Sequence, residues 1–132
     1  MTREEAVLYW IETSDNDYNT MLHLFETEDY HWSLFIGHLV VEKLLKAVFA
    51  KNCDDYQTLP RSHDLLYLAE RARVTLSERL KEQLAVITAF NIQARYPDYK
   101  GAFYKKCTHE YCAGRHEDIR EVRQWLKKIL EV

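Results

Sequence analysis

The chain is poor in the residues that build turns, since three of its 132 residues are glycine and two are proline. Glycine and proline dominate tight turns, so this scarcity excludes a fold made of many short strands and hairpins. Cysteine is as rare as glycine, and Cys53, Cys107 and Cys112 are odd in number. Such a set does not make a disulfide framework, and it fits a reducing compartment.

Long apolar runs and a strong excess of one charge are missing as well. No run of about 18 apolar residues occurs, and the first residues do not show a basic segment followed by an apolar one. We therefore expect a cytoplasmic protein without membrane contact. The formal net charge of -3 argues against a surface that captures duplex nucleic acid by electrostatics.

The chain is rich in apolar side chains at helical spacing. Hydrophobic residues make up 47% of it, and its length fits one domain over residues 1–132 with a sizeable core. Apolar positions recur three and four residues apart, as they do on one face of a helix. This periodicity predicts helices over roughly 3–27, 30–51, 62–73 and 75–95, and a last helix that carries Ile119, Val122 and Leu126.

Local signals refine the boundaries of the fourth helix. Thr75 and Glu78 have the spacing of a capping box, in which each side chain satisfies a backbone amide at the helix start. Pro97 should end this helix, because the residue before a proline avoids helical angles.

The segment between the fourth and last helices is less regular. Residues Tyr99–Lys106 are predicted to form a loop with Gly101 as its flexible point. The last helix begins either at Thr108, acting as a cap, or beyond Gly114, and both starts remain open. Together the elements predict an all-α fold: an up-and-down four-helix bundle with an additional short helix in a crossover.

The stretch Val40–Ala47 places three charged residues in an otherwise apolar helix. Glu42, Lys43 and Lys46 fall on one arc of this helix, because successive residues advance by about 100°. A charge packed against a core is costly unless it is paired, so this strip must line a groove, face a partner or form an ion-pair cluster. Glu42 and Lys46 have the spacing of a favourable pair at i, i+4.

Four segments of the sequence carry a resemblance to a known family. They are Trp10 with Asp17, Tyr30-His31-Trp32 leading into Val41–Ala47, Arg61–Leu65, and Ala94–Asp98. In this order and spacing, over about Tyr9 to Ile129, they resemble the HEPN family, the higher eukaryotes and prokaryotes nucleotide-binding domain.

The resemblance implies a helical bundle that commonly dimerises and is often encoded beside a minimal nucleotidyltransferase. Some members are RNA-cleaving toxins of toxin–antitoxin pairs, whereas others bind nucleotides or act as non-catalytic interaction modules. The nuclease branch carries an arginine followed, after four to six residues, by a histidine. This chain departs from that pattern, since the positions after Arg95 hold Lys100, Gly101 and Ala102. The departure leaves metal-free RNA cleavage without its usual pair of groups.

The same resemblance would bring the second, third and fourth helices together in one nucleotide-binding site. Lys43, Lys46 and Arg95 would hold phosphate oxygens, and Tyr96 would offer a ring to a base. Glu42 and Asp64 would orient these cations, and His63 is the remaining member of the site. The alternative is a buried ion-pair cluster that fixes the helices, with His63 and Asp64 capping the short one.

A second group of residues, Cys107, His109, Cys112 and His116, has side chains of the zinc-ligand type. Their spacing matches no common zinc motif, so we favour histidines that face solvent with one buried cysteine, and we predict no metal and no other cofactor.

Aromatic side chains make up 13% of the chain. The segment Tyr96–Lys106 interleaves them with lysines, as sites for single-stranded nucleic acid do. We favour the alternative, in which its rings cover one end of the bundle and its lysines face water. Tyr9, Trp10 and Trp125, among others, lie at positions where aromatics serve interfaces, which favours a homodimer.

The function that combines these observations is a non-catalytic HEPN-like nucleotide-binding or interaction subunit, paired with a minimal nucleotidyltransferase. One alternative is an RNA-cleaving HEPN toxin with a non-standard active site built from Arg95, His63 and Tyr96. Another is a purely structural dimerisation module without a ligand.

Overall fold

The computed structural model describes residues 1–131, with the backbone alone at positions 97 and 98. Over these residues the regular structure is entirely helical. The helices are α1 (Arg3–Glu26), α2 (Tyr30–Asn52), α3 (Leu65–Arg71), α4 (Glu78–Gln93), α5 (Pro97–Lys106) and α6 (His109–Leu130).

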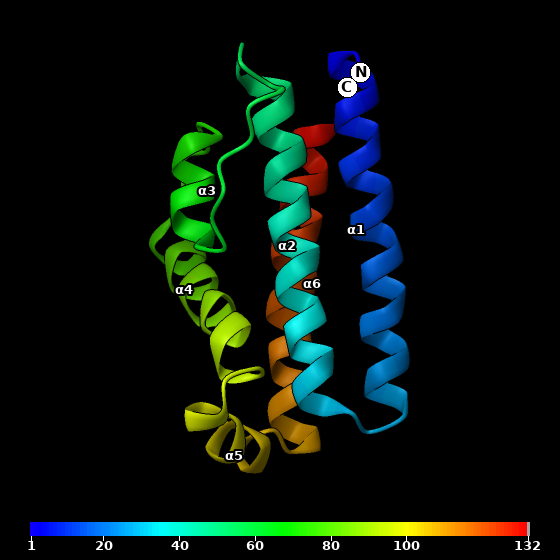
Figure 1. Cartoon of the computed structure of the whole chain (residues 1–132), viewed down its shortest axis with the longest axis vertical. Coiled ribbons are helices and arrows are strands. Elements are labelled where there is room, and N and C mark those ends of the chain that lie inside the picture. Colours follow the sequence, from blue (N-terminus) through cyan, green and yellow to red (C-terminus); the bar gives the residue numbers. More distant parts are fainter. Residues whose placement is uncertain (132) are drawn as a thin grey trace.

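The four long helices run alternately down and up the molecule, as Figure 1 shows. Helix α1 descends and α2 returns beside it, while α4 descends on the other side of α2 and α6 rises behind it. Helix α3 lies in the connection between α2 and α4, and α5 lies across the lower end. The predicted up-and-down bundle with a short helix in its crossover is therefore confirmed.

Helix α2 forms the centre of the bundle, in contact with α1, α3, α4, α5 and α6. Its apolar residues on several faces are buried, among them Val40, Val41, Leu44 and Leu45. Ser14 of α1 is a polar residue within the apolar stripe. It is fully buried, and its hydroxyl donates to the Val40 carbonyl at 2.8 Å. Within the described residues, no helix has the length and apolar character needed to cross a membrane.

Side-chain caps set most helix starts. The Asp64 carboxylate accepts the Leu66 amide at 3.1 Å and begins α3, which is shorter than predicted. Thr108 caps α6, which confirms the earlier of the two possible starts of the last helix. Gly114 therefore lies within the helix. The predicted capping box at Thr75 is wrong, because the residue that caps α4 is Ser77.

The largest correction concerns Tyr99–Lys106, which is not a loop. It forms most of α5, whose first residue is Pro97. Proline is well suited to the first turn of a helix, since its fixed φ is helical and its missing N–H is not needed there. The Tyr96 carbonyl accepts the Lys100 amide at 2.8 Å, and Gly101 continues the helix.

Candidate functional site

The centre of the predicted site is Glu42, a carboxylate on α2 that is 4% exposed. Its Oε1 accepts a hydrogen bond from His63 Nδ1 at 2.7 Å, and its Oε2 accepts one from Lys46 Nζ at 3.1 Å. His38 Nε2 lies 3.9 Å from Oε1. Burial raises the pKa of Glu42, but the His63 hydrogen bond, the Lys46 charge and the nearby His38 ring together lower it below its usual value.

His63 stands in the segment before α3, and 60% of its side chain is exposed. The bond from Nδ1 to Glu42 fixes the ring and leaves Nε2 on its other side. The His38 ring nitrogen Nε2 is 2.9 Å from the His63 carbonyl, so it acts as a donor that holds the backbone there. Burial lowers the pKa of His38 and favours its neutral form. An imidazole oriented by a buried carboxylate has the form of a general base.

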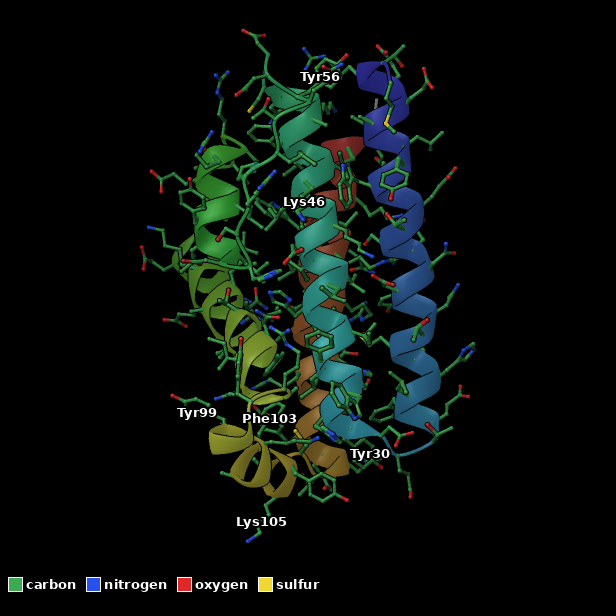
Figure 2. The ribbon with its side chains drawn as sticks, viewed as in Figure 1. Tyr30, Lys46, Tyr56, Tyr99, Phe103 and Lys105 are labelled. Carbon is green, nitrogen blue, oxygen red and sulfur yellow. The ribbon has the colours of Figure 1, made fainter. Side chains whose placement is uncertain are left out.

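Lys46 and Lys43 are both engaged by neighbouring side chains. Lys46, in the upper part of α2 in Figure 2, has its ammonium over the Trp10 ring of α1, 5.0 Å from the centroid, in addition to its bond with Glu42. Lys43 Nζ lies 2.6 Å from Asp17 Oδ2 of α1. These contacts fasten α1 to α2 and leave neither charge free for a phosphate.

Arg95 is arranged differently, at the end of α4. Its Nε donates to the Asn91 carbonyl at 2.9 Å and its Nη2 to the Asn91 side-chain oxygen at 3.0 Å. The guanidinium lies 5.3 Å from the Phe35 ring centroid and 5.5 Å from that of Tyr96. Among the described side chains it has no carboxylate partner. Arg95 is exposed, and Tyr96 is 51% exposed.

The structure thus divides the seven predicted site residues. It brings Glu42, Lys46 and His63 into one hydrogen-bonded cluster, and it places Arg95 against Tyr96. Lys43 turns to α1, and the Asp64 carboxylate caps α3 rather than orienting a cation. Lys43 and Lys46 are thus ion-paired, whereas Arg95 is exposed and lies on the rings of Phe35 and Tyr96.

Sequence reasoning did not assign three side chains that hold these groups. Phe35 supports Arg95 and lies seven positions before Glu42, on the same helical face. Asn91 precedes Arg95 by four residues, a spacing that could have indicated the contact. His38 precedes Glu42 by four residues as well.

Near the start of α6, Cys112 Sγ and His116 Nε2 lie 3.7 Å apart, and Cys107 and Cys112 are both buried. His116 is half-buried, so the prediction of solvent-facing histidines with one buried cysteine is wrong for these residues. His116 Nε2 donates to the Ser33 hydroxyl at 2.7 Å, and His109 packs against the Phe25 ring. Burial raises the pKa of Cys107 to about 11 and that of Cys112 to about 12, so both thiols are protonated. Over the described residues, no three His, Cys, Asp or Glu side chains are grouped to hold a metal ion.

Comparisons with known proteins agree with this architecture. A family model described as "HEPN domain" matches residues 7–130. The solved structure of TT1696 from Thermus thermophilus superposes with a TM-score of 0.80 over 98% of this chain and 99% of that chain, at 18% sequence identity. At that identity the likeness shows a shared fold. A comparison with curated proteins gave no match.

Proposed function

The chain belongs to the HEPN domain family, and from this premise we propose that it is a non-catalytic nucleotide-binding subunit acting with a minimal nucleotidyltransferase. The observation that carries the binding part is the state of Arg95. It is an exposed guanidinium, fixed by two bonds to Asn91, and it has no acidic partner among the described side chains.

A guanidinium held in this way suits a phosphate, because its planar N–H groups match two phosphate oxygens. The exposed Tyr96 ring beside it offers a stacking surface for a base. Burial is the main cause of the lowered pKa of His38, and the charges of His63 and Arg95 add to it. In this proposal Arg95 and Tyr96 bind the nucleotide, while Glu42, Lys46 and His63 fix the wall behind them.

The non-catalytic part rests on the residues after Arg95. Metal-free cleavage of RNA needs a base for the 2'-hydroxyl proton and a cation for the phosphate, within reach of each other. Lys100, Gly101 and Ala102 occupy the positions at which the nuclease branch carries its histidine. A base could come by another route from His63, whose ring is fixed by Glu42.

The binding site is tested by replacing Arg95 and comparing it with Lys43. AMP, ADP and ATP, each in chelator, are expected to raise the melting temperature of the wild type. Arg95→Ala should abolish this rise, since it removes the phosphate ligand. Lys43→Ala is the matched control, because that ammonium is paired with Asp17, and the nucleotide-induced rise should persist.

Two outcomes would contradict the proposal. An equal temperature rise in wild type and Arg95→Ala would remove Arg95 from the site. Cleavage of RNA in chelator by the wild type, lost in His63→Ala, would replace the non-catalytic subunit by an RNA-cleaving toxin with a non-standard site.

A homodimer is the second part of the assembly we propose. Leu8 of α1 is 54% exposed and lines a hollow of about 470 Å³ together with Val7, Ile11 and Leu130, with Arg3, Glu4 and Lys51 completing its lining. Tyr9, the next residue of α1, is 48% exposed. Exposed apolar surface of this kind favours association with another chain. The nucleotidyltransferase partner is supported by family membership alone.

A further inference from the structure

The rings on the lower half of α2 continue beyond Arg95 as a row that ends on α5. Phe35 and Trp32 have centroids 5.9 Å apart, and Trp32 and His31 have centroids 5.0 Å apart. His31 in turn meets Tyr104 of α5 at 5.3 Å. We call Phe35, Trp32, His31 and Tyr104 the aromatic strip. Phe35 and Trp32 are half-buried, His31 between Trp32 and Tyr104 is 9% exposed, and Tyr104 at the end is 63% exposed.

Two cations lie over this strip. The Arg95 guanidinium is 5.3 Å from the Phe35 centroid, and the Lys100 ammonium is 5.4 Å from the Trp32 centroid. Both residues are exposed, and neither has an ion-pair partner among the described side chains. The lysines at 43 and 46, by contrast, are neutralised by Asp17 and Glu42.

The far end of the aromatic strip opens into a hollow of about 300 Å³ between the start of α2 and the end of α5. Its lining residues are Glu28, Tyr30, His31, Tyr104 and Cys107. Tyr30, His31 and Tyr104 contribute rings to it, and the Glu28 carboxylate supplies an acceptor for amino groups. A planar base with an exocyclic amine fits this chemistry.

Proteins bind single-stranded nucleic acids with a row of aromatic rings and nearby unpaired cations. The bases stack on the rings, and the cations contact the phosphates. A site for one nucleotide needs a single ring and a single cation. We propose that the site extends from Arg95 along the aromatic strip to the hollow at Tyr104, and that its ligand is a single-stranded oligonucleotide. This inference rests on the proposed function and specifies its ligand.

The alternative is that Arg95 and Lys100 merely fasten α4 and α5 to α2 through their ring contacts. Helix α5 supplies a control that separates the two. Lys105 lies on the same helix as Lys100 but points away from the bundle, as Figure 2 shows. It therefore has the same charge without the position over the strip.

The experiment measures binding of fluorescein-labelled oligoadenylates of increasing length by anisotropy, in chelator and at physiological salt. The affinity of the wild type should rise about tenfold from about two to about six nucleotides, as successive bases reach rings. Lys100→Ala and Trp32→Ala should each weaken binding of the longer oligomer about five- to tenfold. Lys105→Ala should leave it unchanged, and Trp32→Phe should retain most of it.

The outcomes separate failure of the extended site from failure of the mononucleotide site at Arg95. Equal losses in Lys100→Ala and Lys105→Ala, or an affinity that does not change with length, would overturn the extended site, even if Arg95-dependent stabilisation by AMP persists. The opposite result is that AMP does not stabilise the wild type, while oligonucleotide binding persists and depends on length. It would overturn the mononucleotide site at Arg95 and support the aromatic strip.

Discussion

At the scale of single residues, burial decides what each charge does. Glu42 is 4% exposed and has three nitrogen-bearing neighbours, whereas Arg95 is exposed and lies on rings. A buried carboxylate without such neighbours would be strongly destabilising, so the Glu42 cluster serves first to hold α2 against the segment before α3. The pairing of Glu42 with Lys46 was predictable, because a single helix brings positions i and i+4 together.

His116 provides a titration that belongs to this scale. Its Nε2 donates to the Ser33 hydroxyl at 2.7 Å, and Ser33 donates in turn to the Met21 carbonyl at 2.8 Å. Burial lowers the pKa of His116 to about 4, although the charge of Glu117 opposes the shift. Since the unfolded histidine titrates near 6.5, the unfolded state takes up a proton first as the pH falls.

The free energy of unfolding should therefore decrease as the pH is lowered from 6.5 to about 4, and His116 should contribute on the order of 2 kcal/mol to this decrease. His116→Gln keeps an N–H donor for Ser33 and should remove this part of the loss. Urea unfolding at pH 7 and pH 4.5 measures it, with His109→Gln as the control. An identical pH dependence in wild type and His116→Gln would show that the proton uptake occurs elsewhere.

At the scale of the elements, α5 separates what local sequence specifies from what it does not. The long helices follow from apolar periodicity, which is strong over 16 residues or more. Helix α5 has ten residues with Pro97 at its start and Gly101 inside, and in the sequence alone these two residues favour a loop. Its helical form depends on packing of Phe103, 3% exposed, against Phe90 of α4, which the sequence alone does not reveal.

Two glycine substitutions, one in α5 and one in α2, test how these helices are packed. A Cβ at Gly101 meets no atom within 4 Å, so Gly101→Ala should stabilise the protein by about 0.5–1 kcal/mol through helix propensity. At Gly37 of α2 a Cβ would lie 3.0 Å from Met21 Sδ and closer still to Ile119 Cδ1, so Gly37→Ala should destabilise by about 1–3 kcal/mol. Urea unfolding measures both. No gain from Gly101→Ala would argue for an irregular segment.

At the scale of the whole molecule, the fold was predictable and the site only in part. The number of long helices and their short connections fix an up-and-down bundle. Contacts between helices depend on how each is rotated about its axis, and one sequence does not determine that rotation. Two contacts depend on this rotation: the ion pair of Lys43 with Asp17 and the packing of Arg95 on Phe35.

The exposed apolar surface of α1 carries a prediction at the same scale. If the protein is a dimer through Leu8 and its hollow, Leu8→Glu should give a monomer, because it would bury a carboxylate in the interface. Light scattering after gel filtration measures the mass. Val86→Glu is the control, since Val86 is 39% exposed on α4, away from α1. A dimer that survives Leu8→Glu would place the interface elsewhere.

The central position of α2 has a kinetic consequence. Helices α1 and α2 are joined by a three-residue turn, so their contacts close a short loop and can form early. Helix α6 meets α2 across more than fifty intervening residues and must arrive later. Because every other helix contacts α2, none of the core can form fully before it. We therefore expect folding to start at the amino-terminal hairpin, and loss of the α6 contacts to be the first step of global unfolding.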